Sequence, residues 1–465
     1  MRKHSFIALL LSLLVLLTAC VFTKPPTNNG KADAVYLFAI NDTHGALYTE
    51  GDYPGLDRVA GLLAELEKNN GEYVKIADGD IFQGSYISNI HYGLPLLSAL
   101  NEMGFDAFVL GNHEFDWGLD KIARYADGDE KNGEADFPFL AANVFYNGEK
   151  LDWTRDYTIV EKGGRKVGII GVIGYGLESS ISADKVAGYQ FYDPIPIVRN
   201  LAAKLRSEEK CDLVIVACHD YSQYFYLQVA AFSEASFVDA IVCGHTHQYI
   251  EEEELREDDY VIPIIQSDDK NESVGEIVFR FGADGKLQSA SMRHYDPMLY
   301  KADEAVAAVI AEYEDDIEAG ERVIAYTVEN LSRSRLGEEM TRAMKEKYGV
   351  DVAIINTGGV RESIGRGLIR VKDVYEVFPF DNRIILTGIN GRQLNNLYHE
   401  QGPHLYFSSF AFYTIDEYAT YQVAIVDYVY YQSYYTDYFT GFTPELTDDL
   451  MRDVFIEYLE INYEQ

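Results

Sequence analysis

The sequence predicts an α/β fold in two units, and three features of the chain lead to this prediction. From residue 35 to about residue 239, short apolar segments alternate with amphipathic ones, as strands and helices do in an α/β domain. The chain has 465 residues, roughly three times the usual length of one domain. An acidic, alanine-rich segment at 303–319 is predicted to be a helix, and a second α/β-like pattern follows it.

The individual elements are placed by their apolar runs. Strands are predicted at 35–40, 74–77, 107–110, 212–217 and 238–242, and helices at 56–68 and 94–103. Hairpins are predicted at 157–173 and 274–291, with turns at Gly163-Gly164 and Asp284-Gly285. The second unit is predicted to begin at 323–329 and to end in a helix that Thr447 caps, with Asp448 and Asp449 in its first turn.

Composition and charge exclude several classes of protein. Apolar residues make up 47% of the chain and charged residues 25%, which excludes a disordered or collagen-like protein. The formal net charge of −36 repels phosphate backbones, so no nucleic-acid polymer is expected as a partner, and no protein partner is evident. Four cysteines provide no disulfide framework. A disulfide between Cys218 and Cys243 is conceivable outside the cell, but buried free thiols are favoured.

The N-terminus has the pattern of a processing signal. A basic start precedes an apolar run at 6–17, which is too short to span a membrane comfortably. The run ends at Leu17-Thr18-Ala19-Cys20, which resembles the lipobox of bacterial lipoproteins. We therefore expect a signal peptide at 1–19, a diacylglycerol on Cys20 and a polar tether at 20–33, with the protein lipid-anchored to a bacterial membrane or cell surface. An ordinary secretory signal is the alternative.

Metal-capable side chains follow the predicted strands of the first unit. Because the C-terminal ends of such strands meet at one edge of the sheet, we expect these side chains to converge. They are Asp42, His44, Asp80, Asn112, His219, His245 and His247. Carboxylate, imidazole and amide ligands suit Zn, Mn, Fe, Co or Ni. A lone histidine is rarely a ligand, but seven such residues are too many for one ion and suit two, which can clamp a displacement at phosphorus.

The order of these groups is similar to that of a known family. Asp-x-His, Gly-Asp, Gly-Asn-His-Glu, His and Gly-His-x-His occur in this order in the calcineurin-like metallophosphoesterases. The stretches that resemble the bacterial 5′-nucleotidase branch are 41–45, 79–85, 111–118, 356–361 and 378–382. The resemblance implies a four-layer αββα phosphoesterase domain at 34–301, a linker helix at 302–325 and a smaller α+β substrate-binding domain at 326–465.

The resemblance also implies roles for residues of the first domain. It assigns Asp42, His44, Asp80 and His247 to one divalent ion and Asp80, Asn112, His219 and His245 to the other, with Asp80 bridging them. His113, oriented by Asp116, would stabilise charge on the phosphoryl oxygens or assist the leaving group. Two dications acidify a bridging water, so that hydroxide exists near neutral pH.

In the second domain the resemblance points to a nucleotide site. Arg361 offers a donor fork for phosphate, and Gly358 and Gly359 expose backbone N–H groups. Phe380 is similar to the family's base-stacking aromatic residue and Asn382 to its base-edge residue, while Asn356 belongs to the same glycine-containing stretch. A surface salt bridge for Arg361, and a core position for Phe380 beside a turn at Asn382, are the structural alternatives.

Two departures from the family pattern concern the same site. The family's arginine before Leu336-Gly337 is replaced by Ser332, and Arg333 or Arg335 could substitute for it. The family's Gly-Gly-Asp-Gly-aromatic segment, which supplies a second stacking ring, is absent. Tyr434 and Tyr435 are nearest in order to that ring.

These observations predict a two-metal phosphohydrolase outside the cytoplasm that removes phosphate from nucleoside monophosphates by attack of a metal-bridging hydroxide. A second hypothesis keeps the chemistry but changes the substrate to 2′,3′-cyclic nucleotides, nucleotide-sugars or another phosphate ester. A third is a surface lipoprotein that binds a ligand without turnover. The complete metal set, together with His113 and Asp116, argues against the third hypothesis.

Overall fold

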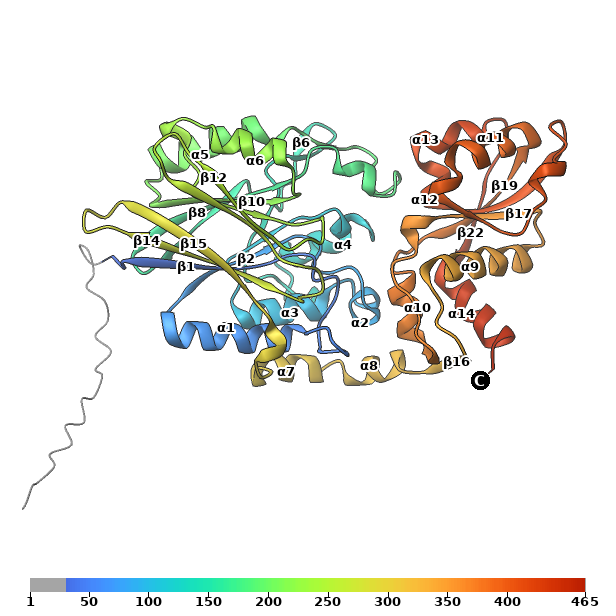
Figure 1. The fold of residues 1–465 in the computed structure, drawn as a ribbon, viewed down its shortest axis with the longest axis horizontal. Coiled ribbons are helices and arrows are strands. Elements are labelled where there is room, and N and C mark those ends of the chain that lie inside the picture. The colour runs from blue at the N-terminus through green and yellow to red at the C-terminus, as the bar shows by residue number, and fades with distance from the viewer. Residues whose placement is uncertain (1–30, 465) are drawn as a thin grey trace, which may run out of the picture.

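The computed structural model describes residues 31–464, so the predicted signal, the lipidation site Cys20 and most of the 20–33 tether lie outside the described residues. Figure 1 shows two bodies side by side, joined along one edge by α7 (Glu304–Ala311) and α8 (Glu314–Gly320). The acidic segment predicted as one helix therefore forms two short ones. Within residues 31–464, none of the helices combines the length and the apolar character needed to cross a bilayer.

Two six-stranded sheets form the centre of the first body. One has the order β15-β14-β1-β2-β3-β4, with parallel β1 (Ala34–Ile40), β2 (Tyr73–Asp78), β3 (Ala107–Val109) and β4 (Phe139–Leu140) and the hairpin of β14 (Val274–Phe281) and β15 (Leu287–Tyr295). The other has the order β12-β13-β11-β10-β8-β7. Its strands are β7 (Tyr157–Lys162), β8 (Arg165–Ile173), β10 (Leu213–His219), β11 (Ala240–Cys243), β12 (Ile250–Leu255) and β13 (Val261–Gln266). The predicted strands and both hairpins are confirmed.

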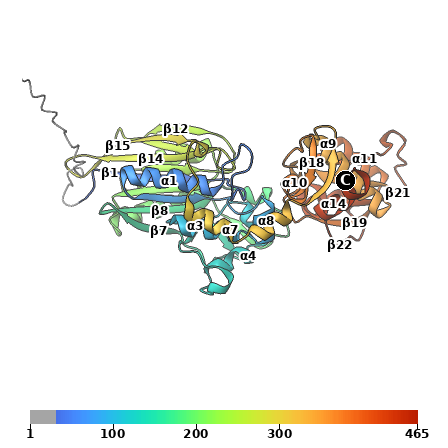
Figure 2. The same ribbon diagram turned by 90° about the horizontal axis from the view of Figure 1, so that it is seen from below.

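The apolar side chains of β1 occupy both of its faces, which places this strand between two layers. Leu37 belongs to a buried cluster that contains Ile215 of the second sheet, whereas Phe38 and Ile40 pack in the cluster that includes the helices. Helices α1 (Leu56–Asn70) and α3 (Leu94–Met103) cover the first sheet, and α5 (Pro194–Ser207) and α6 (Gln223–Ala230) cover the second (Figures 1 and 2). The predicted four-layer αββα sandwich is confirmed.

Short elements complete the first body. They are α2 (Tyr86–Ile90), η1 (His113–Phe115), α4 (Asp120–Ala123), η4 (Leu177–Ser180) and the small sheet of β5 (Val144–Tyr146), β6 (Glu149–Lys150) and β9 (Tyr189–Phe191). Cys218 and Cys243 lie opposite each other on β10 and β11, and both are buried free thiols, as favoured from the sequence.

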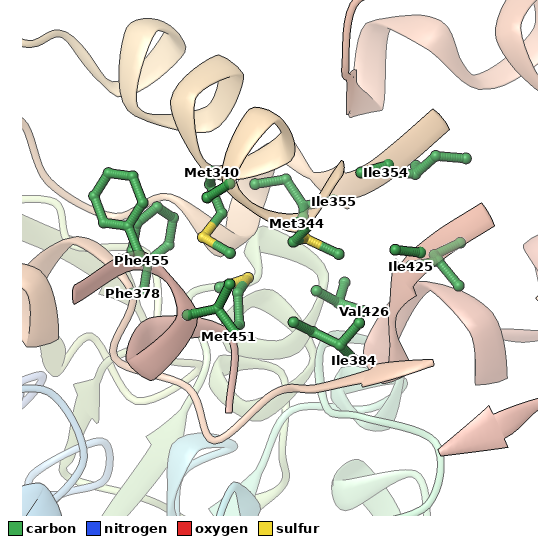
Figure 3. Close-up of a cluster of buried hydrophobic side chains, with 14 of the residues drawn as sticks. Met340, Met344, Ile354, Ile355, Phe378, Ile384, Ile425, Val426, Met451 and Phe455 are labelled. Carbon is green, nitrogen blue, oxygen red and sulfur yellow. The ribbon is translucent and has the colours of Figure 1, made fainter. Parts of the chain in front are cut away.

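The second body is built on a five-stranded sheet of order β20-β17-β21-β19-β22. The strands are β17 (Val352–Asn356), β19 (Arg383–Asn390), β20 (Leu405–Phe407), β21 (Thr420–Val426) and β22 (Glu445–Leu450), beside a separate pair, β16 (Val323–Thr327) and β18 (Gly367–Arg370). The helices are α9 (Arg333–Tyr348), α10 (Val371–Val377), α11 (Gly391–Gln401), α12 (Asp427–Tyr431), α13 (Ser433–Thr436) and α14 (Met451–Asn462). Figure 3 shows Met340, Met344 and Met451 meeting Ile384 and Phe455 in the core between the helices and the sheet.

The predicted cap of the final helix is wrong. Thr447 lies within β22, and its hydroxyl donates to the carbonyl oxygen of Ile384 (2.8 Å). Helix α14 begins at Met451, and its N-cap residue, Leu450, makes no side-chain cap. Pairing of β22 with β19 therefore outweighs the local capping preference of the Thr447 segment.

Candidate metal centre and substrate site

The seven expected metal ligands converge where strands of both sheets end. Asp42 and His44 follow β1, Asp80 follows β2, Asn112 follows β3, His219 ends β10, and His245 and His247 follow β11. Five of them adopt the left-handed backbone region that non-glycine residues rarely enter. They are Asp42 (φ 48°), His44 (47°), Asp80 (52°), His245 (73°) and His247 (53°). Such strain at one place is typical of functional sites, because the surrounding structure must hold it.

The donor atoms form three overlapping groups, each with its atoms within 4.8 Å of one another. The groups are Asp42, His44 and His247; His44, Asp80 and His113; and Asp80, His219 and His245. Asp80 belongs to two of them, in keeping with a bridging position. Asn112 lies beside the third group, because its Oδ1 is 2.8 Å from His245 Nδ1. The site can therefore hold divalent metal ions.

Two atomic details fit a cation rather than a hydrogen-bonded network. Asp80 Oδ2 and His219 Nε2 are buried and 3.0 Å apart, yet neither makes a hydrogen bond of normal geometry. The Nε2 atoms of His44 and His247 also face each other at 3.0 Å. Buried polar atoms without partners are costly, and a metal ion would satisfy Asp80 Oδ2 and His219 Nε2 as well as the two facing nitrogen atoms.

The imidazoles are held by their other nitrogen atoms. His44 Nδ1 is 3.0 Å from the carbonyl oxygen of Gln83, and His219 Nδ1 is 2.7 Å from that of Asp78. His247 Nδ1 is 3.3 Å from Asp269. Each contact leaves Nε2 directed at the centre, which is how metal-binding histidines are usually oriented.

The electrostatic environment favours metal-competent protonation states. Burial lowers the pKa of His245 to about 4 and holds the pKa of His44 well below its usual value, so both rings are neutral near pH 7. Burial would raise the pKa of Asp80, but the neighbouring imidazoles of His219 and His113 outweigh it and hold that pKa well below its usual value.

Glu114 is a supporting residue to which the sequence analysis assigned no role. Its carboxylate accepts hydrogen bonds from the backbone N–H groups of Asp80 (2.9 Å), Ile81 (3.0 Å) and Gly111 (2.7 Å). It thereby ties the loop after β2 to the loop after β3. Its place in Gly-Asn-His-Glu is the signal that could have found it. Asp269, which contacts His247, has no such signal.

His113 and Asp116 form a close pair at the edge of the metal centre. His113 Nδ1 is 2.7 Å from Asp116 Oδ2, because the turn of η1 places residues three apart on the same side. Burial lowers the pKa of His113, but the carboxylates of Asp80 and Asp116 outweigh burial and raise it. The ring also stacks on Phe380 of the second body, with centroids 5.5 Å apart and planes at 23°.

A cavity of about 250 Å³ lies between the two bodies and brings the predicted residues together. Those from the first body are Asn112, His113, Asp116, His245 and His247, and those from the second are Asn356, Gly358, Arg361, Phe380 and Asn382. Within the described chain, the Arg361 side chain makes no ion pair, and its guanidinium lies 6.0 Å from the Phe380 ring centroid. We refer to this space as the inter-domain cavity.

Five expected substrate residues do not line the inter-domain cavity: Arg333, Arg335, Gly359, Tyr434 and Tyr435. Gly359 is buried next to the Asn356 side chain. Arg333 donates to the carbonyl oxygen of Val360 (2.7 Å) and lines a larger neighbouring cavity, whereas Arg335 pairs with buried Glu339 (2.6 Å). The Tyr434 side chain is 48% exposed, and Tyr435 is buried in the core. Neither tyrosine lines the inter-domain cavity. Tyr428, which the sequence analysis did not single out, does line it.

Comparisons with known proteins agree with this geometry. Residues 36–249 match the calcineurin-like phosphoesterase family, and residues 309–434 match the 5′-nucleotidase C-terminal domain. The chain is 25% identical to a 5′-nucleotidase of Vibrio cholerae over 85% of this chain and 81% of that one. It is 27% identical to an apyrase of Tabanus yao over 73% of this chain and 66% of that one.

Solved structures show the same fold. A 5′-nucleotidase precursor from Thermus thermophilus superimposes with a TM-score of 0.76 at 22% identity, covering 92% of this chain and 96% of that one. A 5′-nucleotidase from Candida albicans superimposes with a TM-score of 0.69 at 14% identity, covering 93% and 99%. With both domain models matched in order, the chain belongs to the calcineurin-like phosphoesterases that have a 5′-nucleotidase C-terminal domain, and it is a metal-dependent phosphoester hydrolase.

Proposed function

We propose that this protein is an extracytoplasmic two-metal phosphohydrolase that removes phosphate from nucleoside monophosphates. One observation supports this most strongly: the inter-domain cavity is lined both by metal-capable side chains of the first body and by Phe380 and Asn382 of the second. A nucleotide needs both groups, because its phosphate and its base lie at opposite ends of the molecule. The domain boundaries we propose are 34–301, 302–325 and 326–465.

Two ions would be held by Asp42, His44, Asp80 and His247 and by Asp80, Asn112, His219 and His245. When bound, they would supply positive charge for the phosphoryl oxygens and acidify water, whichever of Zn, Mn, Co, Ni or Fe they are. Arg361, free of other ion pairs in the described chain, would bind the phosphate. Gly358 lines the cavity without a side chain, so it would let the substrate approach the backbone beside Asn356.

His113 would act on the leaving group. Its protonated form is favoured by two carboxylates, and Asp116 fixes Nδ1, so that Nε2 is the nitrogen that can donate a proton. The leaving nucleoside oxygen becomes neutral when it takes that proton. Phe380, stacked on His113, would hold the base while it also closes the cavity from solvent.

Hydrolysis of a panel of substrates tests the proposal, with inorganic phosphate measured for the monoesters and the products separated by chromatography for the diesters. Protein treated with a chelator should lose activity on nucleoside monophosphates and regain it when divalent ions are added back. Cyclic nucleotides, nucleotide-sugars and aryl phosphates complete the panel. Hydrolysis of none of the panel under any metal would overturn the proposal and favour a binding protein.

A second function has a specific observation in its favour. A cavity of about 930 Å³ adjoins the metal centre and shares His247 and Arg361 with the inter-domain cavity. It would give room for a second substituent on phosphorus, as in a nucleotide-sugar or another diester. Preference for a diester in the substrate panel would place this function ahead of the monoesterase.

The location outside the cytoplasm is supported by the N-terminal pattern. We propose that Cys20 carries the lipid anchor. A Cys20→Ser variant should stay unprocessed or be released from the membrane fraction. Normal processing with membrane retention would overturn the proposed anchor and leave the enzymatic proposal intact.

A further inference from the structure

Two charged side chains of the inter-domain cavity have no part in the proposed catalysis. Asp427 stands at the first position of α12, and Lys185 lies in the first body between η4 and β9. Both line the cavity together with Asn382 and Tyr428. Asp427 begins the stretch that stands in this chain where the family has its second stacking segment.

Strand pairing places Asp427 beside the proposed base site. The last paired residues of β21 and β19 are Val426 and Ile384, so the next residues along, Asp427 and Arg383, are neighbours. Asp427 therefore lies near Asn382, and both line the inter-domain cavity.

The Asp427 carboxylate has unused acceptor capacity. It accepts the backbone N–H of Tyr428 (2.8 Å) and a backbone hydrogen bond from Arg383, and it forms no ion pair within the described residues. Burial raises the pKa of Asp427 to about 6, so the group is still ionised near pH 7. An ionised carboxylate has room for about four hydrogen bonds and accepts only.

Lys185 supplies the opposite chemistry. Its side chain is half-buried and, among residues 31–464, makes no ion pair and no side-chain hydrogen bond. Its charge is close enough to lower the pKa of Asp427, yet the two groups do not touch. A donor and an acceptor thus face one cavity with space between them.

A contact between the bodies holds this arrangement in place. Gln432, buried in the turn between α12 and α13, donates from Nε2 to the carbonyl oxygen of Ile181 (2.9 Å). Ile181 follows η4 and lies four residues before Lys185. The hydrogen bond from Gln432 to Ile181 therefore connects the helix that begins at Asp427 to the segment of the first body that contains Lys185.

We propose, on the basis of the proposed nucleotidase function, that Asp427 and Lys185 recognise the base and favour a 6-oxopurine, guanine above all. Guanine presents O6 and N7 as acceptors, which suit a lysine, and N1–H and the 2-amino group as donors, which suit a carboxylate. Adenine places an amino group where guanine has O6 and an acceptor at N1. Adenine would therefore place its amino group, a donor, against Lys185 and its N1 acceptor against the Asp427 carboxylate. These mismatched contacts lower the affinity for adenine.

Values of kcat/KM for GMP, IMP, AMP and UMP test the proposal. A bidentate contact of this kind discriminates by about 5- to 150-fold, so the wild-type ratio of GMP to AMP should lie in that range. IMP, which lacks the 2-amino group, should fall between them. An Asp427→Asn variant, which still accepts the Tyr428 N–H, should lose most of the preference, and Lys185→Met should reduce it.

Asp437→Asn is the control, because Asp437 is an exposed carboxylate just after α13 that does not line the cavity. Its GMP to AMP ratio should equal that of the wild type. A wild-type ratio near one, or an unchanged ratio in both test variants, overturns the inference while leaving the nucleotidase proposal in place. Hydrolysis of p-nitrophenyl phosphate but of no nucleotide would instead overturn the nucleotidase proposal.

Discussion

Two groups of side chains line the inter-domain cavity and are positioned in different ways: the metal-capable residues, called here the metal end, and the residues proposed to bind the base, called the base end. At the metal end, residues leave the ends of neighbouring strands, and five of the seven expected ligands have positive φ angles that fix their direction. At the base end, one residue comes from a loop of the first body and the others from a strand end and a helix of the second. The metal end is therefore set by sheet topology, whereas the base end depends on how helices and bodies pack.

The largest effect is expected at Asp80, which belongs to two of the three donor groups. Asp80→Asn removes the charge that would hold both cations, so turnover should fall by several orders of magnitude and bound metal should be lost. Elemental analysis and phosphate release measure the two effects. Asp127→Asn, at an exposed carboxylate, is the control. Near-normal turnover and metal content in Asp80→Asn would contradict the bridging role.

His113 separates chemistry from metal binding at the same end. His113→Ala should lower kcat by about 10²–10⁴-fold, the usual contribution of a general acid, with metal content near normal. Because His113 Nε2 is also 3.9 Å from Asp80, metal loss is a real competing outcome. If elemental analysis detects such a loss, His113 is a ligand and the proton donor must be sought elsewhere.

At the base end the expected effect is smaller. Phe380→Ala should lower kcat/KM for a nucleotide by about 5- to 150-fold, because stacking on a base is worth about 1–3 kcal/mol. A small aryl phosphate, which extends less far into the cavity, should lose less. Phe412→Ala, outside the cavity, is the control. Equal losses on both substrates would mean that Phe380 acts mainly by supporting His113, on which it stacks.

The same contrast explains what the sequence could predict. Strand ends are visible in the sequence as the limits of apolar runs, so Asp42, Asp80 and His245 could be placed at one sheet edge from the sequence alone. The position of Tyr435 could not, because it depends on which face of α13 turns toward the core. The pairing of β22 with β19, which draws Thr447 into a strand, likewise joins segments 63 residues apart.

The smallest effect is expected where the two bodies meet. Glu376 of α10 lines the larger cavity, and burial, reinforced by Glu50, raises the pKa of Glu376 to about 7. The pKa of this carboxyl is higher in the folded chain than its ordinary value of 4.5, so the folded state binds more protons between these two values. Stability therefore falls as pH rises from about 4.5 to about 7, by up to about 3 kcal/mol.

Glu376→Gln removes this ionisable group and should raise the Tm by a few degrees at pH 8 and much less at pH 5. Thermal unfolding followed at both pH values measures the difference. Glu318→Gln, at an exposed carboxyl, should shift neither value. A lower Tm for Glu376→Gln at pH 8 would mean that Lys270, which faces Glu376 and pairs with Glu362 (2.5 Å), already compensates the buried charge. The pH dependence of stability at this junction would then be determined by ion pairing with Lys270 rather than by the burial of Glu376.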